Sequence, residues 1–264
     1  MFAKLLKYDI KKTIKFFLVL YGLALLAACL ARLCSYSSNT FISIIGNISE
    51  SFVWVTLINA FVNHIMRLIS YFRRDLYGDE SYLLHTLPVK TSTIYWSKFA
   101  AAFIILVLNF LVSAVAIKIT YTGTAFADFL GSIIPEFSSV LGLSTPGLVW
   151  LLVAILFVEI LNFIVVGFLG HILGFRKNNN TKLGWSILYI FAIYIAVSIF
   201  IVLVTLLAGL INPDILKIFT EAENNIDPAV FTPTIIACLC GYIIAILTIA
   251  LASARTLNRG VNVL

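Results

Sequence analysis

Residues 147–172 read GLVWLLVAILFVEILNFIVVGFLGHI, and this run decides the fold class. A helix that crosses about 30 Å of hydrocarbon needs roughly 20 mostly apolar residues. The run is long enough and continuously apolar, and Glu159 is its only Asp, Glu, Lys or Arg residue. It therefore predicts a transmembrane helix.

The composition extends this prediction to the whole chain. Mean hydropathy is +1.06 and only 11% of residues are charged, whereas charged residues make up about a quarter of a soluble domain. Transmembrane strands would alternate apolar and polar residues, which these runs do not. We expect an all-α membrane protein, a single transmembrane domain over 1–264 with six transmembrane helices. The predicted spans are about 16–37, 51–70, 99–121, 147–172, 184–211 and 234–254.

The distribution of Lys and Arg predicts the orientation of the chain. Fifteen of the 18 basic residues fall on one side of the predicted spans, and Arg32, Lys118 and Lys217 fall toward the other. Both termini are therefore expected in the cytoplasm. The net charge of +6 follows from this topology and from attraction to anionic membrane lipid, and requires no nucleic acid as partner.

Residues 1–15 have the pattern of an interfacial amphipathic helix. Lysines recur at Lys4, Lys7, Lys11 and Lys15, while apolar residues such as Leu6 follow the same helical step on another face. Two roles are open for this segment: an anchor that sets the angle of the first span, or a contact with a cytoplasmic partner.

Motifs of common enzymes are absent from the sequence. There is no G-x-x-x-x-G-K-[ST] phosphate-binding loop, no G-x-S-x-G motif and no H-E-x-x-H pair. The histidines His64, His85 and His171 lie in different segments, and Cys238-Leu-Cys240 has no histidine nearby. We therefore expect no catalytic residue, no bound cofactor and no metal site in this chain.

Three polar residues are predicted inside the membrane. Glu159 lies near the middle of its span, Asn162 follows three residues later, and Asn109 has a similar depth in the third span. A charge at that depth costs at least about 2.5 kcal/mol on insertion scales, so Glu159 should face inward or be protonated. A hydrogen-bonded helix contact and a proton or substrate site are both open. Gly167, Gly170 and Gly174 predict close helix packing nearby.

The longest polar stretch between apolar runs is DLYGDESYLLHTLPVKTSTIYWSK, residues 75–98 of the predicted cytoplasmic loop 71–98. An acidic, glycine-containing turn is followed by a short apolar stretch, 82–87, that Pro88 should end. Such a stretch can dock into a groove on a partner or lie against the inner leaflet.

This loop resembles the one between the second and third helices of ABC-2 type permeases, especially small Gram-positive ones. The similarity also covers the six spans, the basic N-terminal helix and the cytoplasmic termini. His85 departs from the usual pattern of the loop, and this bears on which ATPase is the partner. The residues that carry the resemblance, and that it implies couple to an ATPase, are Asp79, Glu80, Tyr82, Leu83, Leu84, His85, Thr86, Leu87 and Pro88.

The resemblance implies a permease subunit in a bacterial cell membrane. Its loop would insert into a separate ABC ATPase, present in two copies, which holds the ATP and Mg. Two permease chains, as a homodimer or related heterodimer, would form the path. The implied activity is export of an amphipathic or hydrophobic substrate, with peptide favoured, as in peptide-toxin and bacteriocin exporters such as the phenol-soluble modulin exporter.

Two other functional classes remain open. An ion-coupled secondary transporter would use Glu159, although its single intramembrane carboxylate and the lack of matching interrupted helices weigh against it. A membrane scaffold or sensor subunit would share the docking loop and transport nothing. The three classes differ in what they depend on. An ABC permease depends on ATP and a partner, a secondary transporter depends on an ion gradient, and a scaffold depends on neither.

Overall fold

A computed structural model describes the chain except for residues 79–80, 82–85, 87, 177–181, 221–227 and 259–264. The described residues form helices and connecting segments, with no strand among them. The elements in chain order are α1 (Phe2–Cys34), α2 (Thr40–Tyr77), α4 (Thr91–Tyr121), α5 (Ala125–Val140), α6 (Thr145–Phe175), α7 (Lys182–Ile211), α8 (Asp214–Thr220), the 3₁₀ turn η2 (Pro228–Val230) and α9 (Phe231–Asn258).

Six of these helices are long and apolar enough to cross a membrane: α1, α2, α4, α6, α7 and α9. Each contains one of the six predicted spans, apart from the last residues of the first. For the described residues, the prediction of helices rather than strands, six of them long and apolar enough to span, is thus confirmed, and the chain is a multi-pass membrane protein.

The helix ends differ from the predicted spans. α1 begins at Phe2, so the predicted amphipathic segment and the first span form one continuous helix. α2 begins at Thr40, where the Asn39 side chain accepts a hydrogen bond from the Phe41 N–H at 2.9 Å. The first turns of α1 and α2 lie outside the predicted spans because their residues are too polar to be predicted as membrane-spanning. They nevertheless continue the helix.

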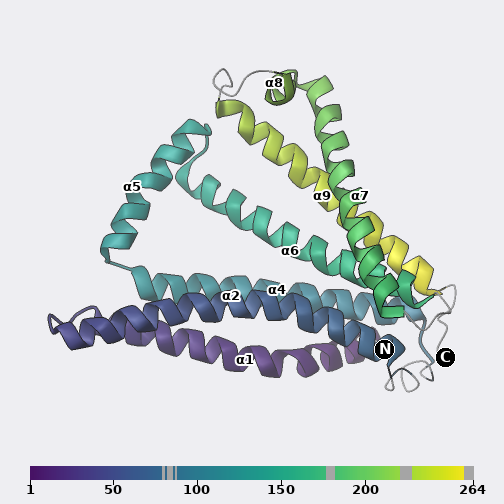
Figure 1. Ribbon diagram of the computed structural model, residues 1–264, viewed down its shortest axis with the longest axis horizontal. Helices are drawn as coiled ribbons and strands as arrows, with labels where there is room; N and C mark the ends of the chain where they lie inside the picture. The colour runs from purple at the N-terminus through teal and green to yellow at the C-terminus, as the bar shows by residue number, and fades with distance from the viewer. Residues whose placement is uncertain (79–80, 82–85, 87, 177–181, 221–227, 259–264) are drawn as a thin grey trace. The chain divides into compact units, whose positions relative to one another are not determined.

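The chain divides into two compact units, Met1–Phe129 and Leu130–Leu264. The first contains α1, α2 and α4, and the second contains α6, α7, α8 and α9 (Figure 1). A single transmembrane domain of six spans would require the two units to associate. That association stays a prediction.

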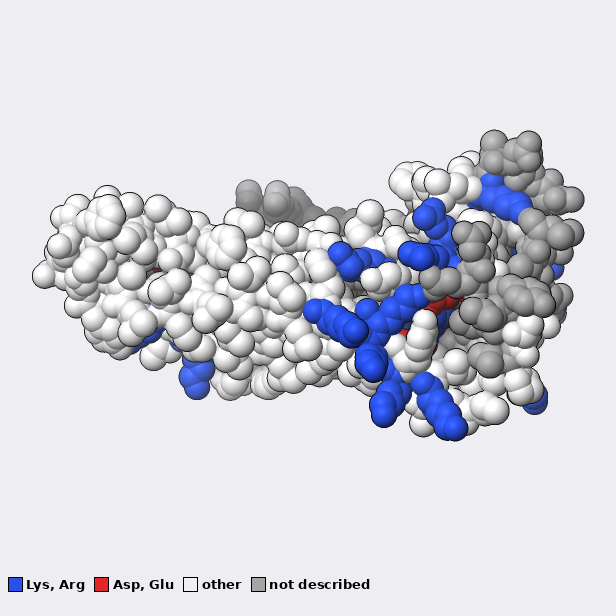
Figure 2. Space-filling model, turned by 90° about the horizontal axis from the view of Figure 1, so that it is seen from below, with Lys and Arg blue, Asp and Glu red and all other residues white. Residues whose placement is uncertain are grey.

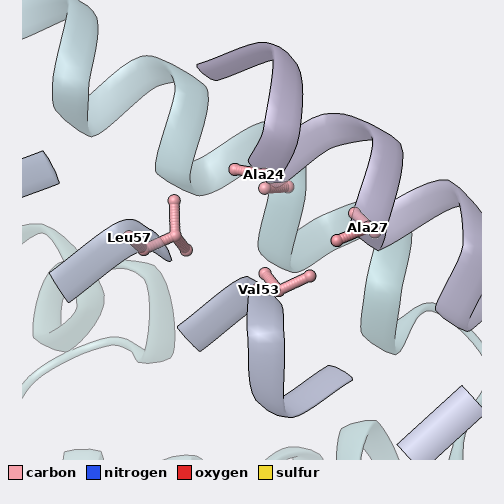
Figure 3. Packing of buried hydrophobic residues seen from close by; sticks show 6 residues of the cluster. Ala24, Ala27, Val53 and Leu57 are labelled. Atoms are coloured by element: carbon pink, nitrogen blue, oxygen red, sulfur yellow. The ribbon is translucent and has the colours of Figure 1, made fainter. Parts of the chain in front are cut away.

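Small side chains bring the helices of the first unit together. Ala24 and Ala27 of α1 face Val53 and Leu57 of α2 (Figure 3), and Ala116 of α4 completes the same buried cluster. Alanines allow helix backbones to approach closely, which is how helices associate in lipid.

Glycines allow two helices of the second unit to pack closely, as the sequence predicts. A Cβ atom built on Gly170 would lie 2.9 Å from the Ile190 backbone nitrogen, and one built on Gly174 would lie 2.5 Å from the Ser186 Cα. Contacts under 3.0 Å are not tolerated by real Cβ atoms. The packing of α6 on α7 therefore requires glycine at both positions.

Candidate functional site

The predicted coupling residues lie between α2 and α4. Thr86 and Pro88 are described and are exposed. Asp79, Glu80, Tyr82, Leu83, Leu84, His85 and Leu87 lie outside the described residues. What the structure does describe in detail is the base of this loop, where α2 ends and α4 begins.

The base of the loop is joined by a buried ion pair. Asp75 lies in the last turn of α2 and Lys98 in the second turn of α4. The Lys98 ammonium donates to Asp75 Oδ2 and, at 3.1 Å, to Asp9 Oδ1 of α1. One lysine side chain therefore ties all three long helices of the first unit together.

Two further groups complete this arrangement, which we call the loop-base cluster: Asp9, Lys12, Asp75, Ser97 and Lys98. Lys12 Nζ donates to Asp75 Oδ1 at 2.8 Å, and Ser97 Oγ donates to Asp9 Oδ2 at 2.5 Å. Asp9, Asp75 and Lys98 are only 8%, 2% and 6% exposed. The cluster is thus a hydrogen-bonded charge network inside the protein.

The charges in the loop-base cluster balance. Two carboxylates, Asp9 and Asp75, meet two ammonium groups, Lys12 and Lys98. Asp75 needs this compensation because a carboxylate in the last turn of a helix faces the negative end of the helix dipole. Removing one partner of a buried pair leaves an uncompensated charge and typically costs about 3–5 kcal/mol. The network therefore holds the two ends of the loop firmly against α1.

The sequence does not predict this cluster. Asp75 is expected in an acidic turn and Lys98 on the basic cytoplasmic side, and Asp9 has no predicted role. One signal was available, since Asp9 falls in step with Thr13 and Phe17 on a face opposite the lysines. That face is the buried face of α1. The long-range pairing itself has no sequence signature.

Figure 2 shows how charge is distributed on one face of the molecule. Lys and Arg side chains gather toward one end, around a small area of acidic side chains, while most of the remaining surface is uncharged. Basic side chains therefore predominate at that end of this face.

A second polar cluster lies in the other unit. The Tyr194 hydroxyl of α7 donates to Glu159 Oε1 of α6 at 3.0 Å, and we call these two residues the Glu159 cluster. The one carboxylate near the middle of a span is therefore bonded to a tyrosine hydroxyl of a neighbouring helix. This bond joins α6 to α7, and it also places a hydroxyl group where a proton could be relayed.

The two asparagines have different surroundings. Asn109 accepts a hydrogen bond at 2.6 Å from the Tyr21 hydroxyl within the first unit. Asn162 is fully buried, and neither its amide nitrogen nor its amide oxygen has a hydrogen-bond partner among the described residues. Tyrosines, rather than the asparagines that the sequence suggested, are thus the hydrogen-bond partners of Glu159 and Asn109.

Metal binding finds no support in the described part of the chain. Within those residues, no three His, Cys, Asp or Glu side chains are grouped so as to hold a metal ion. The four cysteines, Cys29, Cys34, Cys238 and Cys240, are free thiols. The loop-base cluster and the Glu159 cluster are the two arrangements of charged groups on which the functional proposals below depend.

Comparison with known proteins identifies no relative of this chain. No protein-family model, curated protein or solved structure matches this chain.

Proposed function

We propose that this chain is the transmembrane permease subunit of an ABC-2 type ATP-binding cassette exporter in a bacterial cell membrane. Both termini lie in the cytoplasm, and the lysine-rich start of α1 lies at the inner membrane interface. The observation that carries the proposal is the loop-base cluster. It fixes both ends of the 75–98 segment, in which the coupling residues lie, to the N-terminal helix.

A coupling loop needs such a base. A partner that pushes on the loop can move the spans only if the loop is attached rigidly to them. Lys98 bonds Asp75 and Asp9 together, so displacement of the loop would be transmitted to α1, α2 and α4 as a set. A loop that merely connected two spans would not require four buried or half-buried charges.

The partner is a separate ABC ATPase in two copies, which supplies the bound ATP and Mg. Within the loop, the contact is made by Tyr82, Leu83, Leu84, Thr86, Leu87 and Pro88, framed by Asp79, Glu80 and His85. ATP hydrolysis belongs to the partner, and this chain is not itself an enzyme. A second permease chain, identical or related, forms the other half of the translocation path.

The substrate class we propose is an amphipathic or hydrophobic molecule, with peptide favoured. The support is compositional, since 61% of the residues are hydrophobic and 14% are aromatic. A translocation path lined by such residues suits an apolar substrate better than a sugar, because a polar substrate would need hydrogen-bonding groups along its path.

Replacing Leu84 and Leu87 with Asp tests the coupling assignment. Two carboxylates in an apolar contact would remain unpaired on docking, so the affinity-tagged chain should lose most of its co-purifying ATPase while its amount in the membrane is unchanged. The matched control is Leu183→Asp at the exposed start of α7, where a carboxylate suits the helix dipole. Equal amounts of ATPase with the Leu84/Leu87 variant and the Leu183 control would contradict the assignment.

The hydrogen bonding of Glu159 supports one alternative, an ion-coupled secondary transporter. In that case Glu159→Gln should abolish transport, because an amide cannot take up and release a proton as a carboxyl group does. Under our proposal the variant transports normally and its melting temperature falls by a few degrees. Transport into vesicles with and without a proton gradient, alongside a thermal melt, distinguishes the two.

A further inference from the structure

The first four turns of α1 present an open cavity of about 510 Å³ lined by Tyr8, Lys11, Lys12 and Lys15. Lys11, Lys15 and Tyr8 are exposed. Within the part of the chain that the structure describes, no ion pair involves Lys11 or Lys15. The cavity therefore has positive charge available for an anionic ligand.

The side chains of the cavity suit a phosphate group. Lysine ammonium groups donate only, and the Tyr8 hydroxyl adds another donor, so the described lining residues match an acceptor with several oxygens. Lys12 lies 5.9 Å from the centre of the Tyr8 ring and 5.3 Å from that of Tyr71 while it bonds Asp75. It thus joins the wall of the cavity to the loop-base cluster.

The position of the cavity along α1 indicates where the phosphate comes from. Beyond Lys15 the exposed residues of α1 become apolar, beginning with Leu18 and Val19 and continuing to Leu33. At 1.5 Å per residue, Leu18 lies about 4.5 Å from Lys15 and about 10 Å from Lys11 along the helix axis. The polar headgroup layer on each side of a bilayer is about 5–7 Å thick. The two lysines therefore flank the depth at which lipid phosphates lie.

We propose that this cavity binds the headgroup phosphate of an anionic phospholipid of the inner leaflet. The site does not depend on the proposed export function. Its occupant contacts Lys11 and Lys15 directly and reaches the loop-base cluster through Lys12. A lipid bound here would therefore stabilise the N-terminal helix against the base of the loop.

Native mass spectrometry of the purified full-length chain tests the proposal, with dioctanoyl phosphatidylglycerol as the probe and dioctanoyl phosphatidylcholine as the zwitterionic comparison. The wild type should bind phosphatidylglycerol preferentially. The double variant Lys11→Gln/Lys15→Gln should bind it roughly 30-fold more weakly, from about 1 kcal/mol for each lysine near an anionic surface. Lys11→Arg/Lys15→Arg should retain binding, which shows that charge rather than folding is at issue.

The matched control is Lys4→Gln/Lys7→Gln, which removes two exposed lysines from the same helix but none from the cavity. It should leave phosphatidylglycerol binding within about twofold of wild type. Equal losses in the two glutamine variants would mean a diffuse surface effect and would overturn the site. Saturation by inorganic phosphate alone, at the lipid concentrations used, would overturn the assignment to a lipid.

Discussion

At the scale of single residues, Lys98 has the largest structural role that we identify. It is a basic side chain at the start of a span, yet it is buried and bonded to carboxylates from two other helices. Long lysines near helix ends usually extend to the membrane interface. Lys98 turns inward because Asp9 and Asp75 offer it two buried acceptors.

Replacing Lys98 with Met should therefore destabilise the protein strongly. The variant leaves two buried carboxylates close together with only Lys12 to compensate them, and we expect a loss of about 3–5 kcal/mol. A thermal melt of the purified protein in detergent would show it. Lys90→Met, at an exposed lysine just before α4, is the control and should change stability by no more than about 0.5 kcal/mol. Equal melting temperatures for the two variants would contradict the conclusion that Lys98 stabilises the packing of α1, α2 and α4.

Residue-level contacts were also the hardest to foresee. The cost of burying a charge pointed to Glu159 as a helix contact, and Glu159 does bond across helices. Its partner was not foreseen, because Tyr194 is an ordinary aromatic residue in an apolar run. Likewise, Lys98 bonds residues 23 and 89 positions away in the chain. Only the packing of the helices brings such residues together.

At the scale of elements, the long helices could be read from the sequence, because a continuous apolar run of about 20 residues has no other stable form in lipid. Their ends could not. α2 extends through Phe72 and Asp75 to Tyr77, and these turns are stabilised by buried contacts on one face rather than by lipid. The segments 122–146 and 212–233 between the predicted spans contain the shorter helices α5 and α8, whose polar residues keep them out of a search for long apolar runs.

The packing of α6 on α7 gives a prediction at this scale. Gly174→Ala places a methyl group against the Ser186 backbone, so the helices must separate, and we expect a loss of about 1–3 kcal/mol in a thermal melt. Gly184→Ala is the control, because a Cβ atom on Gly184 of α7 meets nothing within 4 Å. The control should be neutral or slightly more stable. Equal melting temperatures for Gly174→Ala and Gly184→Ala would contradict the close packing of α6 on α7 at Gly174.

At the scale of the whole molecule, each compact unit supplies three long apolar helices, and the two polar clusters are divided between them. The loop-base cluster belongs to the first unit and the Glu159 cluster to the second. The first unit therefore carries the proposed coupling to the ATPase. The second carries the one carboxylate that an ion-coupled mechanism would need.

The central claim is that this chain operates with a separate ATPase. The most direct measurement is to purify the tagged chain from its native host in mild detergent and to identify and quantify what co-elutes by mass spectrometry. We expect an ABC ATPase in a one-to-one ratio with the permease chains. Elution of the chain without any nucleotide-binding subunit would contradict the claim and would favour an ion-coupled transporter centred on Glu159.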